Sequence, residues 1–216
     1  RSPAEMLPAV ARLDTESLHQ VVAADSGIAS RHALRGRQIS LDEEGSGTRL
    51  AARLVPKASG LSERDREAVD VRADEAVAAM RPGRLDGFFL LAGDPVVPVR
   101  AAARDLGARR VPIRGDAARK LIADCAFCTY GLISSATYDP HPAVETLGVN
   151  AFWLMRADLE QKLIYSITRA LFHPLLRPLL ASGHPAASEI QLEIALAGVT
   201  VPLHPGPERF YREQEL

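Results

Sequence analysis

The sequence predicts an α/β protein built on a largely parallel sheet. Short runs of β-branched and apolar residues alternate with segments of helical periodicity, and glycine or proline separates many of them. The length of 216 residues is enough for one medium domain or two small lobes with a sizeable core. Residues 85–91 form the most apolar run and are expected to be a central strand, because both of its faces are apolar.

Strands and helices take turns along the first 123 residues. Glycine follows several of the expected helices, as at Gly36, Gly60 and Gly107, and Asp116 is expected to cap another. The expected elements, in chain order, are a strand at 19–24, a short helix at 30–34, a strand at 37–41, a helix at 48–57, a short helix opened by Ser62 and Asp65, a helix at 73–80, the strand at 85–91, a helix at 95–106, a strand at 109–113 and a helix at 116–123.

The pattern changes after residue 123. Residues 125–142 are rich in turn formers and have no sustained period, which indicates a connection between lobes. A strand is expected at 146–155, then a long helix with Asp158 and Gln161 as a capping box, which Pro174 ends. The chain then continues with an amphipathic helix at 186–197 and a short helix at the end of 201–213.

Four segments follow from this reading. They are a polar N-terminal segment (1–17), an α/β ligand-binding lobe (18–123), an inter-lobe connector (124–143), and a C-terminal part (144–216) whose returning strand and helices pack on the remaining lobe.

Composition excludes several classes of protein. The chain is 47% hydrophobic and 25% charged, which is typical of a folded globular protein. Its 26 basic and 27 acidic residues give a net charge of −1, without the positive excess of a dedicated nucleic-acid binder. The longest apolar run is far shorter than the roughly 20 residues that cross a bilayer.

The most informative local feature is the run Gly45, Ser46, Gly47, Thr48 between a strand and a helix. Small residues let a ligand approach the backbone, and the first helical N–H groups and the helix dipole favour a carboxylate or phosphate. An ordinary helix N-cap is the alternative. A dinucleotide fingerprint would need glycine where Leu50 stands, and a P-loop would need lysine at position 48.

Acidic residues at 42–44 precede this run. They would repel a polyanion but could attract an ammonium group, so an amino acid, which carries both charges, fits better. A second loop, 91–95, follows the strand that contains Asp86, Phe88 and Phe89. Parallel strands would bring both loops to one sheet edge. Asp86 could bind a substrate amine there or cap local amides, and at least one of the two phenylalanines is expected in the core.

The remaining reactive residues give weak signals. Cys125 and Cys128 form a CxxC that follows a helix rather than a strand, so a local disulfide or a pair of buried thiols is favoured over a redox or metal role. The six histidines have no metal-site spacing, and no GxSxG elbow is present. The sequence therefore predicts no catalytic residue, no metal site and no cofactor.

Several motifs together resemble one family. The run HQVVAADSGIASRHALRGRQISLDEEGSGT resembles the strand, short helix and GSGT loop of TAXI-family solute receptors of TRAP transporters. LDGFFLLAGDP, SSATY and ETLGVNAFWLMRADL are similar to later elements of that family, and VPLHPGPERFYRE is the most specific match. The motifs occur in the family's order over residues 18–213.

The resemblance implies a type II periplasmic binding-protein fold, in which two lobes close over a small carboxylate such as glutamate or a dicarboxylate. The ligand would be passed to TRAP permease subunits outside the cytoplasmic membrane, in the periplasm or an equivalent compartment, and no reaction is expected. Carried over by position, the ligand-binding residues would be Gly45, Ser46, Gly47, Thr48, Asp86, Phe88, Gly93 and Tyr138.

This sequence also departs from the family. It has Gly87 where alanine is usual, and it begins after the strand and glycine-rich turn that build most of the first lobe. We therefore expect either a piece of a longer receptor, which segments outside this chain could tether to the membrane, or a naturally reduced relative. A ligand-sensing or interaction domain of a larger membrane-associated protein is the alternative function, and an enzyme that uses Cys125 or Cys128 is the least favoured.

Overall fold

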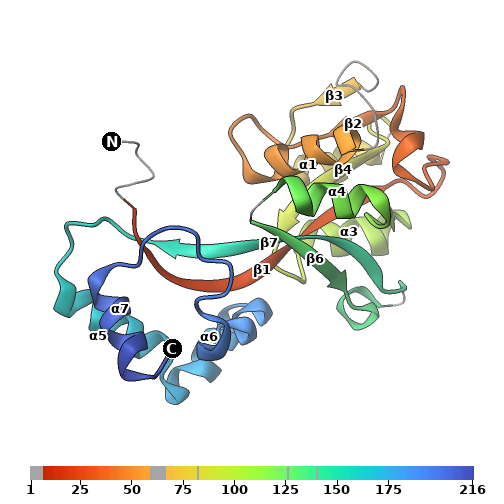
Figure 1. The fold of residues 1–216 in the computed structure, drawn as a ribbon. Coiled ribbons are helices and arrows are strands. Elements are labelled where there is room, and N and C mark those ends of the chain that lie inside the picture. The colour runs from red at the N-terminus through yellow and green to blue at the C-terminus, as the bar shows by residue number, and fades with distance from the viewer. Residues whose placement is uncertain (1–6, 59–66, 82, 126, 140) are drawn as a thin grey trace. The chain divides into compact units, whose positions relative to one another are not determined.

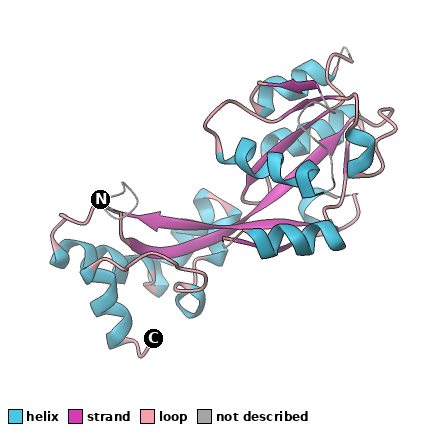
Figure 2. Cartoon of the chain, turned by 45° about the horizontal axis from the view of Figure 1, so that its top comes forward, coloured by secondary structure: helices cyan, strands magenta, loops and turns pink. Residues whose placement is uncertain are grey.

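The computed structural model describes residues 7–58, 67–81, 83–125, 127–139 and 141–216. Within them, seven strands form one sheet in the order β3-β2-β4-β1-β7-β6, with β5 paired to β1 (Figures 1 and 2). The strands are β1 (Ala9–Val22), β2 (Gln38–Ser40), β3 (Glu67–Val69), β4 (Gly87–Ala92), β5 (Arg109–Arg110), β6 (Cys128–Ile133) and β7 (Val144–Leu154).

The α/β class with flanking helices is confirmed, but the sheet is mixed rather than largely parallel. β2 runs parallel to both β3 and β4, whereas β1 is antiparallel to β4 and β5, and β6 is antiparallel to β7. Hydrophobic periodicity reports which side chains are buried and says nothing of strand direction, so the sequence could not reveal the reversed central strand. β1 also begins at Ala9, ten residues before the predicted start.

The helices of the first half agree with the sequence to within a few residues. The short helix opened by Ser62 and Asp65 lies outside the described residues. The α-helices are α1 (Gly47–Ala58), α2 (Ala73–Met80), α3 (Val97–Leu106), α4 (Asp116–Asp124), α5 (Gln161–Leu171), α6 (Arg177–Gly183) and α7 (Pro205–Glu213), and the 3₁₀ helices are η2 (Arg31–Leu34), η4 (Ser135–Tyr138), η5 (Pro174–Leu176), η6 (Pro185–Glu189) and η7 (Leu192–Ile194).

Two predictions in the second half are wrong. The helix expected at 186–197 is replaced by η6 and η7, because the backbone is extended at Ile190 and Gln191 between them. The capping box of Asp158 and Gln161 does not form. Glu160 occupies the N-cap of α5 without a side-chain hydrogen bond, and Asp158 instead pairs with Arg156.

The chain divides into two compact units. The middle unit comprises residues 16–149, and the terminal unit comprises the described residues up to 15 together with 150–216. β1 and β7 pass from one unit into the other. The segment 124–143, expected to connect lobes, contains β6 and η4 and belongs to the middle unit, and the segment 1–17 contains the first half of β1.

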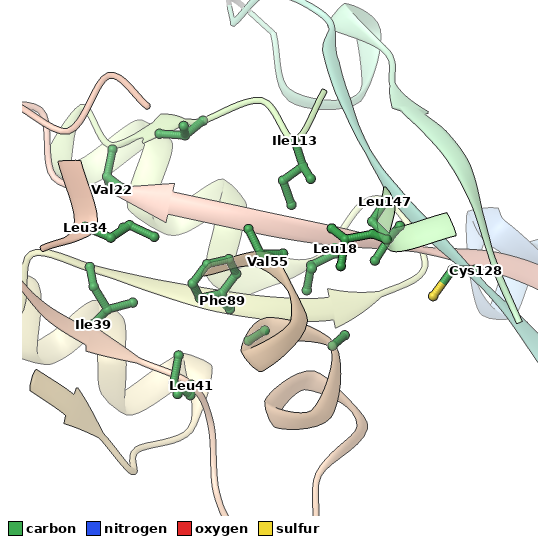
Figure 3. Close-up of a cluster of buried hydrophobic side chains, with 14 of the residues drawn as sticks. Leu18, Val22, Leu34, Ile39, Leu41, Val55, Phe89, Ile113, Cys128 and Leu147 are labelled. Atoms are coloured by element: carbon green, nitrogen blue, oxygen red, sulfur yellow. The ribbon is translucent and has the colours of Figure 1, made fainter. Parts of the chain in front are cut away.

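The middle unit buries both faces of its sheet. On β1 and β4, side chains alternate between two hydrophobic clusters, with Leu18, Val22 and Phe89 in one and Val21 and Phe88 in the other. Figure 3 shows the first cluster, which α1 and α4 help to cover. Residues of α2 and α3 cover the second. This alternation follows from the two-residue period of a strand.

The terminal unit has a smaller core. Val10 and Ala11 of β1 pack with Ile164 of α5 and with Phe210 and Tyr211 of α7. The Tyr211 hydroxyl donates to the Val10 carbonyl at 2.8 Å, which ties the C-terminal helix to the strand. No helix within the described residues is both long and apolar enough to span a bilayer.

Candidate functional site

Two loops meet at one edge of the sheet. β2 and β4 are parallel, so their carboxyl ends lie at the same edge, as the sequence predicts. The Thr48 hydroxyl, which follows β2, accepts a hydrogen bond from the Leu91 N–H at the end of β4, at 3.1 Å. We call this region, residues 45–48 and 91–95, the loop edge.

The N-terminus of α1 is open at the loop edge. α1 begins at Gly47, and the Ser46 hydroxyl caps it by accepting from the Arg49 N–H at 3.0 Å. The N–H groups of Gly47 and Thr48 have no acceptor among the residues that the structure describes. Gly47 is exposed, so solvent or a ligand can reach its amide. Free N–H groups and the helix dipole together favour an anion here.

Arginines lie close to the acidic residues at 42–44 that precede the loop edge. Arg49 donates to the Asp42 carbonyl at 3.0 Å and pairs with the carboxylate of Asp70. Arg72 lies 3.7 Å from a carboxylate oxygen of Glu43. These cations reduce the repulsion that the acidic residues would exert on an anion at α1.

A buried polar network lies beneath the second loop, and sequence reasoning missed most of it. The Ser17 hydroxyl donates to Asp94 at 3.0 Å, and His19 Nε2 lies 2.7 Å from the other oxygen of the same carboxylate. The Tyr138 hydroxyl lies 3.1 Å from His19 Nε2 and accepts from the Val96 N–H at 2.8 Å. The network therefore ties the chain on both sides of Pro95 to β1 and η4.

Burial keeps the Tyr138 phenol neutral, whereas the Val96 N–H and Arg110 act on its pKa in the opposite direction. Burial raises the pKa of Tyr138 well above its usual value. The guanidinium of Arg110 lies over the tyrosine ring, 4.8 Å from its centroid. On the other side of the His19 ring, the carbonyl oxygens of Ser17 and Leu90 lie 2.9 and 3.2 Å from Nδ1.

Replacing Tyr138 by phenylalanine is expected to destabilise the fold by about 1–3 kcal/mol, because the partly buried Val96 N–H loses its acceptor. A raised folded pKa means that the neutral phenol contributes fully below pH 10.0, its unfolded value, and that this contribution is lost as pH rises above it. Urea unfolding at pH 7 and pH 11 checks both points. An alkaline loss of stability that is as large in the variant as in the parent would contradict the assignment.

Two predicted site residues lie away from the loop edge. Asp86 precedes β4 and so sits at the opposite end of that strand from the second loop. Its carboxylate accepts from the Gln38 N–H at 2.9 Å and lies 3.5 Å from Arg37, which fits the capping alternative. Phe88 is fully buried in the second hydrophobic cluster. The strand alternation that was expected to bury at least one phenylalanine buries both Phe88 and Phe89.

The other predicted site residues lie at or next to the loop edge. Gly45, Ser46, Gly47 and Thr48 form one side of the loop edge, and Gly93 belongs to the other. Tyr138 is buried and reaches the second loop through Val96 rather than by exposing its own ring.

The two cysteines do not belong to the loop edge, and the described residues form no metal site. Cys125 and Cys128 are joined by a disulfide, and both are buried in the first hydrophobic cluster. Within the described part of the chain, no group of three His, Cys, Asp or Glu side chains is arranged to hold a metal ion.

Comparison with known families gives one assignment. A family model described as the NMT1-like family matches residues 1–214. The chain belongs to the NMT1-like family. The matched residues include the loop edge in the middle unit and the helices of the terminal unit.

Solved binding proteins resemble this NMT1-like chain more distantly. The periplasmic sulfonate-binding protein SsuA of a putative sulfonate ABC transporter from Methylobacillus flagellatus KT is 18% identical, with a TM-score of 0.48, over 96% of this chain and 59% of that one. The probable amino-acid ABC transporter extracellular-binding protein ytmK from Bacillus subtilis is 14% identical, with a TM-score of 0.48, over 89% and 66%. The alkanesulfonate-binding protein SsuA from Xanthomonas axonopodis pv. citri, bound to MOPS, is 24% identical, with a TM-score of 0.37, over 49% and 34%. This chain thus spans less than two thirds of the length of each of these proteins.

Proposed function

We propose that this chain belongs to a solute-binding protein that works outside the cytoplasmic membrane and delivers a small carboxylate to a transporter. The observation that carries the proposal is the pair of N–H groups at Gly47 and Thr48, which have no acceptor within the described part of the chain and lie at an edge where two loops meet. Backbone amides at a helix N-terminus that are left without an acceptor suit a carboxylate oxygen.

The recognition chemistry follows from the same geometry. One carboxylate oxygen of the ligand would accept from the Gly47 and Thr48 amides, and the Ser46 side chain borders the same position. The Thr48 hydroxyl oxygen already holds the Leu91 amide, so its part is to fix the second loop against α1. The binding group then needs little reorganisation when the ligand arrives, which favours affinity.

The charge around the loop edge favours a small ligand over a polyanion. Asp42 and Glu43 lie beside the helix N-terminus, and Asp94 closes the second loop. An amino acid such as glutamate, or a dicarboxylate, can place one carboxylate on α1 without bringing further phosphates toward these acids. We exclude Asp86 and Phe88 from the proposed site because of their positions in the fold.

The transporter type is proposed from the sequence motifs. The GSGT run and the terminal VPLHPGPERFYRE resemble TAXI receptors of TRAP transporters, which favours TRAP permease subunits as the partner. In such a receptor a ligand held between two lobes stabilises the closed state by its greater affinity for that state.

Native mass spectrometry of the gently purified whole protein tests this proposal. We expect a co-purifying small molecule that carries at least one carboxylate and is displaced by an excess of L-glutamate or succinate. A bound sulfonate, a bound cation, or retention of the bound molecule in the presence of both competitors would contradict the proposed substrate class.

A further inference from the structure

The terminal unit carries an exposed surface that its own core does not explain. It lies on α5, η5 and α6 (Figure 1), and we call it the α5–α6 surface. Three leucines on it are strongly exposed, Leu163 by 50%, Leu175 by 80% and Leu179 by 67%. The exposed part of each side chain contributes nothing to the stability of this unit through burial. The residues that define the surface are Lys162, Leu163, Arg169, Leu175, Arg177 and Leu179.

Geometry joins the apolar and basic parts of this surface. A hollow of about 430 Å³ places Leu175 beside Arg169, with Ala170 and Leu176 also in its lining. The backbone is right-handed helical at Leu176 and Arg177, so η5 runs directly into α6. Leu175 and Leu179 are four residues apart along this helical stretch and therefore project to the same side.

The charge of this part of the chain is one-sided. Residues 161–188 contain Lys162, Arg169 and Arg177 but no aspartate or glutamate, although the whole chain has 27 acidic residues in 216. A neighbouring hollow of about 540 Å³ brings Arg209 of α7 beside Lys162 and Arg169, with Glu160 as the acidic residue in its lining. Arg209 pairs with Glu213 at 2.8 Å, so the positive charge of the surface comes from Lys162, Arg169 and Arg177. The surface thus combines exposed leucines with a net positive charge.

We propose that the α5–α6 surface docks on an anionic lipid surface. Leu175 and Leu179 would enter the boundary between headgroups and acyl chains, while Lys162, Arg169 and Arg177 lie against anionic headgroups. Leucines that project from a helical turn, flanked by cations and free of acids over 28 consecutive positions, match the two components of a membrane interface more closely than the polar rim of a protein partner. The inference is independent of the ligand site, which lies in the middle unit.

Co-sedimentation of the whole protein with vesicles tests it. The probes are vesicles of phosphatidylcholine alone and of phosphatidylcholine with about one third phosphatidylglycerol. We expect binding to the anionic vesicles that weakens as salt rises. Lys162→Glu should weaken it by about fivefold or more, and Leu175→Glu combined with Leu179→Glu should abolish it. The matched controls are Lys120→Glu and Val97→Glu, which change an exposed lysine and an exposed valine in the middle unit and should leave binding unchanged.

The outcomes are distinct. Circular dichroism identifies any variant that fails to fold, and in that case Lys162→Glu, a change of an exposed side chain, carries the test alone. Equal binding to neutral and anionic vesicles, or no binding to either, would overturn the proposal. So would equal effects of the test and control variants. Binding to soluble poly-glutamate without binding to vesicles would also overturn it and would indicate an acidic protein partner instead.

Discussion

A Gly47→Pro variant should bind L-glutamate and succinate at least about tenfold more weakly than the parent protein. Gly47 is the first residue of α1, a position where proline is compatible with the helix but has no N–H to donate. Losing one hydrogen bond to a charged group costs about 1.5–3 kcal/mol, which corresponds to a factor of roughly 10 to 150 in affinity. Isothermal titration calorimetry on the whole protein measures the dissociation constants of the variant and the parent.

The matched control is Gly47→Ala, which keeps the amide. A Cβ at this position would meet Leu91 Cδ2 at 3.9 Å, an ordinary contact, so alanine should fit. We expect affinity close to that of the parent. If alanine and proline weaken binding equally, the side chain rather than the amide matters, and the assignment of the anion site to α1 fails.

Phe88→Ala is expected to lower the free energy of unfolding by about 3–5 kcal/mol, because Phe88 is fully buried in the second cluster of the middle unit. A ligand-binding phenylalanine would instead change affinity with little effect on stability. Urea denaturation followed by circular dichroism gives the stability, and calorimetry at a temperature where the variant is folded gives the affinity.

Phe127→Ala serves as the control for this change. Phe127 is 44% exposed and belongs to the same unit, so its truncation should cost less than about 1 kcal/mol. A small stability effect of Phe88→Ala together with a large loss of affinity would restore Phe88 to the binding site and contradict its placement in the core.

The sequence predicted best those features in which a residue type is tied to one backbone geometry, such as the ends of helices. Gly107 is left-handed at the end of α3, as its place after a helix predicts, and α1 begins within one residue of the expected start. The meeting of the two loops was also predictable, because it depends on the parallel pairing of β2 and β4. The first two features depend on short stretches of chain, and the third follows from the alternation of strands and helices, which favours parallel neighbours.

Side-chain contacts between distant segments, and the direction of the central strand, were not predictable. Ser17, His19 and Tyr138 come together around Asp94 across up to 121 positions of sequence, and no spacing rule connects them. The direction of β1 likewise depends on its pairing with β4, and only the structure shows that pairing. Gly87 illustrates the same point, since a Cβ there would lie 2.4 Å from the Val21 carbonyl oxygen of the neighbouring strand.

The measurement that tests the central claim most directly is an NMR titration of the backbone amides with L-glutamate. We predict that the Gly47 and Thr48 signals move in a saturable manner with the downfield proton shift of a new hydrogen bond, in step with the calorimetric binding curve. If glutamate binds while these two amides stay unchanged and the shifts occur elsewhere, the N-terminus of α1 is not the anion site.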